Sequence, residues 1–138
     1  MKTLFRLTLL IALLLSVSAC GSQPSEHDAA LIAVVENSIA AWNAEDLDAV
    51  LALYADDAVV ANKLGTFEGK EKIRSLFESA IDEFSQDCRN YKANGNTVSY
   101  ECALIGRDDG KAYAGEKYEL VIENGLIVSD KFIGNFTP

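Results

Sequence analysis

Two carboxylates in the C-terminal third of the chain have the type and placement that best suit chemistry. On the last two expected strands, the even positions form the more apolar face, because side chains alternate between the faces of a strand. Asp130 is the one charge on that face of the final strand, and Glu116 is a second candidate on the strand before it. A carboxylate among apolar neighbours is either paired or raised in pKa, and the raised case suits general acid–base catalysis. The alternative for Asp130 is a hydrated place at the rim of the sheet, or an ion pair with Lys117 or Lys131.

The sequence lacks the residue patterns of metal sites, nucleophile–histidine pairs and phosphate-binding loops. The one histidine, His27, falls at the start of the first expected helix, so the sequence supplies neither a zinc cluster nor a nucleophile–histidine pair. Asp56 and Asp57 lack the ligand spacing of a calcium loop and are interpreted as the end of the second helix. The sequence has no glycine-rich phosphate loop. We therefore expect no metal and no cofactor.

Residues 1–19 have the pattern of an export signal. Lys2 and Arg6 form a positive segment before the apolar run 7–15, which is too short to span a bilayer. The tetrapeptide V-S-A-C that ends at Cys20 resembles a bacterial lipobox, which implies cleavage before Cys20 and lipidation of its side chain. The alternative is a soluble secreted protein with an unmodified Cys20.

The residues after the signal are expected to tether a folded domain to a membrane. Residues 20–25 have no apolar anchor and contain a proline, and the domain is expected over residues 26–138. Gly21 stands where an Asp would resemble an inner-membrane retention signal. We expect a lipid-anchored protein of the bacterial cell envelope: on the outer membrane facing the periplasm in a Gram-negative host, and otherwise on the outer leaflet of the cell membrane.

The charge of the chain argues against nucleic acid as a partner. Cleavage removes Lys2 and Arg6 from 12 basic residues and leaves all 21 acidic ones, so the mature chain has a formal charge of −11. No basic run is present that could neutralise phosphates. We therefore expect the protein to contact a membrane only through the lipid on Cys20. The acidic residues are spread along the sequence and are interpreted as a solvated surface.

Cys88 and Cys102 are predicted to form a disulfide. Export favours bridged over free cysteines, and these two are the remaining pair once Cys20 is lipidated. A hairpin turn over residues 94–96 places Cys88 directly opposite Cys102. A redox-active pair is the alternative, but the CxxC spacing is absent.

Helical periodicity dominates residues 26–86. Apolar residues at spacings of three and four predict a long first helix from Glu26, a short second helix, and a third helix from Lys70 to about Gln86. A short buried strand, 58–61, separates the second helix from the third. The residues on the inner faces of the three helices are Leu31, Val34, Val35, Ser38 and Trp42, then Leu47, Val50, Leu51 and Tyr54, and then Ile73, Leu76, Phe77, Ala80, Ile81 and Phe84.

Residues 88–136 change to a period of two. The dipeptides Asn94-Gly95, Asp109-Gly110 and Asn124-Gly125 are turn signals that divide this part into four strands. Four strands joined by short turns form an antiparallel meander. The order helix, helix, strand, helix and four strands predicts an α+β domain, with three N-terminal helices packed on one face of a curved, mostly antiparallel sheet.

The stretch from Trp42 to Lys70 carries a family resemblance. W-N-A-E-D-L-D-A-V-L-A-L-Y-A-D-D-A-V-V, followed by G-T-F-E-G-K-E-K-I, resembles the nuclear transport factor 2-like superfamily, nearest its SnoaL-like branch, and the likeness extends over about residues 29–136. The resemblance implies a cone-shaped sheet closed by helices, with a pocket at its wide end. Such cones serve isomerases, cyclases, hydrolases and non-catalytic domains, so activity must be argued from the site.

Ketosteroid isomerases share enough of this stretch for a comparison by position. The place of their general base is held here by Asn62, which cannot take a proton at neutral pH. The places of their two oxyanion-hole donors are held by Ser38 and Tyr118. The resemblance therefore implies a related pocket without isomerase activity.

We expect the pocket to be lined by Ser38, Trp42, Tyr54, Asn62, Glu116, Tyr118 and Asp130. The first functional hypothesis is non-catalytic binding of a small ligand or an envelope protein. The alternative is a SnoaL-like acid–base enzyme that acts on a small apolar or carbonyl compound, with Asp130 as acid–base and Tyr118 and Asn62 as orienting donors. The resemblance also implies possible dimerisation through the outer face of the sheet. The apolar residues expected on that face are Tyr113, Val121, Ile127 and Ile133.

Overall fold

The computed structural model describes residues 24–138. The predicted signal 1–19, Cys20 and the first part of the tether lie outside these described residues. Within the described part of the chain, no helix has the length and apolar character needed to cross a membrane.

Side-chain caps fix the starts of the first two helices. Helix α1 (Glu26–Asn43) begins with a capping box, in which the Asp28 backbone N–H donates to the Ser25 hydroxyl (3.1 Å) and the Ser25 N–H donates to the Asp28 carboxylate (3.2 Å). Helix α2 (Leu47–Ala52) is capped by Asp46, whose carboxylate accepts a hydrogen bond from the Ala49 N–H at 3.0 Å. Both caps are short polar side chains that satisfy N–H groups left without a helical partner.

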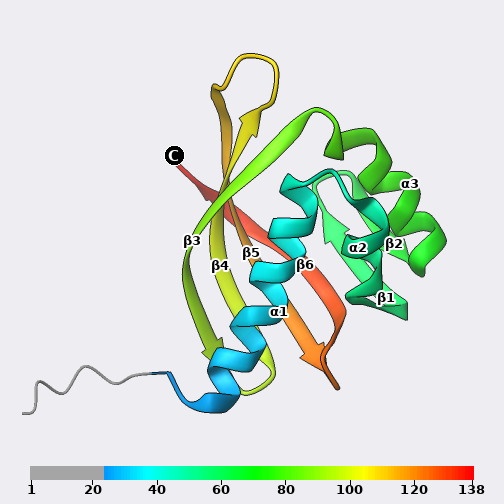
Figure 1. Cartoon of the computed structure of the whole chain (residues 1–138), viewed down its shortest axis with the longest axis vertical. Helices are drawn as coiled ribbons and strands as arrows, with labels where there is room; N and C mark the ends of the chain where they lie inside the picture. The colour runs from blue at the N-terminus through cyan, green and yellow to red at the C-terminus, as the bar shows by residue number, and fades with distance from the viewer. Residues whose placement is uncertain (1–23) are drawn as a thin grey trace, which may run out of the picture.

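Six strands form one curved sheet (Figure 1). The strands are β1 (Tyr54–Asn62), β2 (Gly65–Glu68), β3 (Phe84–Asn94), β4 (Thr97–Gly106), β5 (Ala112–Glu123) and β6 (Leu126–Phe136). Their order in the sheet is β2-β1-β6-β5-β4-β3, and β1 runs parallel to β6 while all other pairs are antiparallel. Helix α1 packs on β3 and β4, and helix α3 (Lys70–Ile81) packs on β1, β2 and β3. The predicted α+β cone is confirmed.

Two predicted helix ends are wrong, because strand pairing overrides a local helical pattern, and one strand is additional to those predicted. Tyr54 begins β1, where it pairs with Ile127, instead of ending α2, and Asp56 and Asp57 therefore lie in a strand. Strand β2 has no counterpart among the predicted strands, yet it pairs with β1 from Val59 to Asn62. Helix α3 ends at Ile81, and the following residues join the sheet as β3.

The predicted disulfide between Cys88 and Cys102 is present, although the hairpin loop is one residue shorter than the expected turn over residues 94–96. The hairpin loop has two residues, because Asn94 pairs directly with Thr97, and this register alone would shift Cys88 out of line with Cys102. A bulge between Arg89 and Lys92 restores the alignment, and Asn90 within it has a positive φ of 61°.

A second bulge corrects the predicted outer face. Between Val121 and Ile122 the pairing of β5 with β6 shifts, so that Ile127 lies opposite Ile122 on the inner face. Ile127 is fully buried and belongs to the core, so it cannot contribute to a dimer surface. Of the other residues expected there, Tyr113 and Ile133 are exposed.

Arg107, which follows β4, forms hydrogen bonds to the C-terminal ends of helices α1 and α3. Its guanidinium donates to the carbonyls of Trp42 (2.9 Å) and Asn43 (3.3 Å) in α1 and of Ile81 (2.8 Å) in α3. Neither helix has a basic residue in its last turn, so Arg107 supplies the positive charge that their carbonyl ends favour. The Asn43 amide adds two hydrogen bonds to the backbone of Gln86, at 2.8 and 2.7 Å.

Candidate ligand cavity

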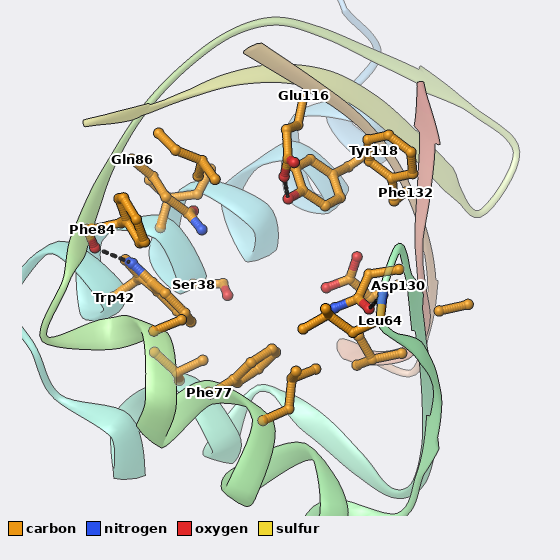
Figure 2. A pocket seen from close by; sticks show the side chains of 18 of the residues that line it. Ser38, Trp42, Leu64, Phe77, Phe84, Gln86, Glu116, Tyr118, Asp130 and Phe132 are labelled. Carbon is orange, nitrogen blue, oxygen red and sulfur yellow. Dashed lines mark hydrogen bonds between the residues drawn. The ribbon is translucent and has the colours of Figure 1, made fainter. Parts of the chain in front are cut away.

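A cavity of about 280 Å³ lies between the helices and the inner face of the sheet (Figure 2). Every helix and all strands except β2 contribute to its lining, and most lining side chains are apolar. Three lining residues are exposed, Lys63, Leu64 and Ser79, and these mark its rim. The other lining residues include Ile39, Val50, Val60, Ala61, Leu76, Phe77, Ala80, Phe84, Gln86, Tyr100, Leu104 and Phe132.

Asp130 is the buried charge of this cavity. Its strand neighbours are Val60 on β1 and Leu120 on β5, both buried, so apolar side chains flank it on either side. Oδ2 of Asp130 accepts a hydrogen bond of 2.7 Å from the Tyr54 hydroxyl. None of the ion pairs found among residues 24–138 includes Asp130, so the predicted alternative of a pair with Lys117 or Lys131 is wrong.

Burial raises the pKa of Asp130 to about 6, although the hydrogen bond from Tyr54 acts in the opposite direction. Burial also raises the pKa of the Tyr54 hydroxyl well above its ordinary value, and the nearby Asp130 charge adds to this rise. Asp130 therefore changes charge near neutral pH, whereas Tyr54 stays a neutral donor.

Glu116 occupies a different environment on the same inner face. Its carboxylate forms an ion pair with Lys63 at 2.8 Å and accepts a short hydrogen bond from the Tyr118 hydroxyl. Burial, and then the hydrogen bond to Glu116, raise the pKa of Tyr118. The Lys63 ammonium also lies 4.6 Å from the centre of the Phe132 ring. Glu116 is thus neutralised by a partner at the rim.

Aromatic rings line much of the cavity. Tyr100 and Tyr118 are paired across β4 and β5 and stack with ring centroids 5.6 Å apart, and Phe132 meets Tyr118 edge-on at 6.3 Å. On the helical side, Phe77 packs edge-on against Trp42 (5.3 Å) and Tyr54 (5.6 Å). Such rings offer apolar surface and electron-rich faces to a ligand.

All seven residues proposed from the sequence line this one cavity: Ser38, Trp42, Tyr54, Asn62, Glu116, Tyr118 and Asp130. Two of them have hydrogen bonds to the backbone. The Trp42 indole N–H donates to the Phe84 carbonyl at 2.8 Å, and the Asn62 side-chain oxygen accepts from the Leu64 N–H at 2.8 Å. Figure 2 shows Ser38 and Asp130 directed into the open space.

Sequence reasoning missed Lys63, Tyr100 and the link between Tyr54 and Asp130. The inward direction of Tyr100 could have been predicted from the alternation of side chains along β4, because Val98, Tyr100 and Cys102 form its buried face. Lys63 carries no local signal, because its contact with Glu116 depends on the approach of the β1–β2 turn to β5.

The arrangement can bind a small, mainly apolar molecule and present one titratable carboxylate to it. In the described part of the chain, no three His, Cys, Asp or Glu side chains gather closely enough to hold a metal ion. Proton transfer and hydrogen bonding are the chemistry that these residues themselves supply.

Solved structures share this fold at low sequence identity. A provisionally assigned polyketide cyclase from Sinorhizobium meliloti is 20% identical, with a TM-score of 0.66 over 73% of this chain and 94% of that chain. A nuclear transport factor 2-like protein of unknown function from Cytophaga hutchinsonii is 19% identical, with a TM-score of 0.66 over 82% and 92%. A hypothetical protein with a ketosteroid isomerase-like fold from Catenulispora acidiphila, in complex with trimethylamine, is 18% identical, with a TM-score of 0.62 over 75% and 85%.

The family itself is identified by sequence. Residues 35–129, more than half of the chain, match the family model described as a SnoaL-like domain. The match confirms the family predicted from the residues around the Y-A-D-D-A segment, and the solved structures agree with it in fold. The protein belongs to the SnoaL-like domain family, within the nuclear transport factor 2-like fold.

Proposed function

We propose that this domain binds a small, mainly apolar molecule in its cavity, with Asp130 as the polar anchor. The observation that carries the proposal is a space of about 280 Å³ whose lining is largely apolar and aromatic, with Asp130 buried in it. This volume lies near the lower end of the range for ligand cavities, which favours a compact ligand. A buried carboxylate without a cationic partner lowers the stability of the fold, and recognition of a ligand would account for its presence.

Benzyl alcohol, an apolar ring with one hydroxyl, is a suitable first probe. Titration calorimetry and thermal unfolding should show binding to the wild-type domain and none to Ser38→Phe, which fills the cavity from α1. Asn37→Phe, at the exposed neighbouring position, is the matched control and should bind as the wild type does. Equal binding by both variants would place the probe elsewhere and contradict the proposal.

A second candidate is acid–base catalysis, and one observation favours it. Asp130 has a pKa of about 6 and lines the cavity, so it could take a proton from a bound molecule at neutral pH. The Tyr54 hydroxyl would stay in place and stabilise the ionised form.

Proton exchange tests this candidate without knowledge of the natural substrate. The domain should accelerate exchange of the α-protons of cyclohexanone in heavy water, measured by NMR, with a rate that rises through about pH 6 as Asp130 ionises. Asp130→Asn keeps the shape of the side chain and should abolish the acceleration, while benzyl alcohol still binds. Equal exchange rates for the two proteins would leave Asp130 as an anchor for binding.

The location in the envelope is part of the same proposal. It rests on the positive segment and apolar run in residues 1–15 and on the V-S-A-C segment at 17–20. Labelling cells with a palmitate analogue should mark the full-length protein, and Cys20→Ser should remove the label and release the protein from the membrane fraction. An unlabelled wild-type protein would contradict lipidation.

A further inference from the structure

Asp130 has one oxygen available to a ligand. Tyr54 donates to Oδ2, and no second hydrogen bond to this carboxylate is found among residues 24–138. No buried side-chain oxygen in the same residues lacks a partner, so Oδ1 must be accessible from the cavity. Figure 2 shows the carboxylate directed toward the space bordered by Ser38, Phe77 and Tyr118.

The negative charge of Asp130 is not neutralised by the cavity itself. Besides Asp130, the titratable groups in the lining are Tyr54, Tyr100, Glu116, Tyr118 and Lys63. Burial raises the pKa of all three tyrosines, so each is uncharged at neutral pH. Lys63 is engaged by Glu116 at 2.8 Å and by the Phe132 ring. One formal negative charge therefore remains inside an apolar cavity.

Aromatic side chains line the cavity in which that charge lies. On the sheet, Tyr118 stacks on Tyr100, whose other face is covered by Tyr91. On the helical side, Trp42 and Phe77 form a second aromatic wall. Aromatic rings attract cations through their electron-rich faces, and the attraction is strongest where water is excluded. A carboxylate together with several rings is a set of groups that recognises alkylated ammonium ions.

We infer that the cavity binds a small alkylammonium ion, with its positive charge beside Asp130 and its alkyl groups against Trp42, Phe77 and the stacked tyrosines. This inference rests on the proposed ligand-binding function and adds the chemical class of the ligand. An ammonium ion supplies the countercharge that the protein leaves out, whereas a neutral ligand would leave the ionised carboxylate uncompensated. The net charge of −9 over the whole chain also favours the approach of a cation.

Choline and its neutral isostere 3,3-dimethylbutan-1-ol separate charge from shape. By titration calorimetry at pH 8, choline should bind at least about tenfold more tightly than the isostere, which corresponds to about 1.4 kcal/mol of binding free energy. At pH 5 the affinity for choline should fall about tenfold, because Asp130, with a pKa of about 6, is then mostly protonated. The affinity for the isostere should not fall, because protonation of Asp130 removes the uncompensated charge beside a neutral ligand.

Two variants assign the effect to named residues. Asp130→Asn should make choline and the isostere bind equally, and circular dichroism would establish that the variant is folded. Tyr118→Leu removes one aromatic face and should weaken choline more than the isostere, so it tests the same inference without changing the charge of Asp130.

The outcomes distinguish this inference from the function on which it rests. Equal wild-type affinity for choline and the isostere would overturn the ammonium inference but leave the cavity as a ligand site, and so would binding of benzyl alcohol alone. Absence of binding of all three probes would overturn both. Choline binding that survives Ser38→Phe unchanged would place the cation outside the cavity and overturn the inference.

Discussion

Two carboxylates on neighbouring strands of one sheet face illustrate how environment separates similar residues. Asp130 on β6 is buried, has no cationic partner in the described chain and is held by Tyr54. Glu116 on β5 lies at the rim, where Lys63 pairs with it and Tyr118 donates to it. Each carboxylate accepts from one tyrosine, so the tyrosines do not distinguish them. The difference is the lysine, because the exposed fractions are similar, 9% for Asp130 and 12% for the Glu116 side chain.

The two ends of the cavity therefore differ in electrostatic balance. The Glu116 end is electrically balanced and joins the β1–β2 turn to β5, as a structural contact would. The Asp130 end retains an unbalanced charge at a cost in stability, as a functional group would. Substitutions of each carboxylate and of its partners should reveal this contrast.

The largest effect is expected from Asp130→Asn. The rise of the Asp130 pKa from 3.8 to about 6 corresponds to a penalty of about 3 kcal/mol for the ionised form in the folded state. The penalty is absent below pH 3.8, grows as the pH rises to 6, and is complete above 6. In urea unfolding, the variant should therefore be more stable than the wild type at pH 8, and the advantage should vanish near pH 4.

Glu116→Gln is the matched control for this measurement. It breaks an ion pair instead of removing an unpaired charge, so at pH 8 it should lower the free energy of unfolding slightly or leave it unchanged. A stabilisation of equal size in both variants would show that the two ends do not differ.

An intermediate effect is expected from the two tyrosines. Tyr54→Phe removes the donor to a buried carboxylate and should cost about 2 kcal/mol at pH 8, and it should raise the pKa of Asp130 further, since this hydrogen bond lowers it. Tyr118→Phe should cost about 1 kcal/mol or less, because Glu116 keeps Lys63. Urea unfolding gives both costs, and carboxyl-carbon NMR follows the titration of Asp130. Equal costs would remove the contrast.

The smallest effect is expected from Lys63→Met. The Lys63 side chain is 48% exposed and that of Glu116 is 12% exposed, so the screened ion pair contributes about 0.5 kcal/mol, and high salt should reduce the difference from the wild type. Lys131→Met is the control, because Lys131 is exposed and takes part in no ion pair found in residues 24–138. A large, salt-independent loss would mean that Lys63 acts mainly through its packing on Phe132.

Features encoded within a few residues could be predicted from the sequence. The start of α1 at Glu26 follows from the apolar spacing, and the turns at Gly95, Gly110 and Gly125 follow from glycines, each of which has a positive φ. Alternation along β5 and β6 correctly directed Glu116, Tyr118 and Asp130 inward, because pleating fixes the side of every second residue until a bulge intervenes.

Features set by distant contacts could not be predicted. Tyr54 fits a helical stripe as well as it fits a strand, and only its pairing with Ile127 and its bond to Asp130, 76 positions away, decide between them. The burial of Ile127 depends on a bulge at the β5–β6 pairing, which no short motif marks. The ion pair of Glu116 depends on a turn from the other half of the chain.

The hydrogen bonds of Arg107 to both helix ends also bear on how a ligand would enter and leave the cavity. With the carbonyl ends of α1 and α3 held by one guanidinium, the helical wall resists parting, and exchange is left to the rim, where Leu64 is 78% exposed. Because Leu64 lines the cavity at this rim, truncation of its side chain should speed both the entry and the departure of a ligand.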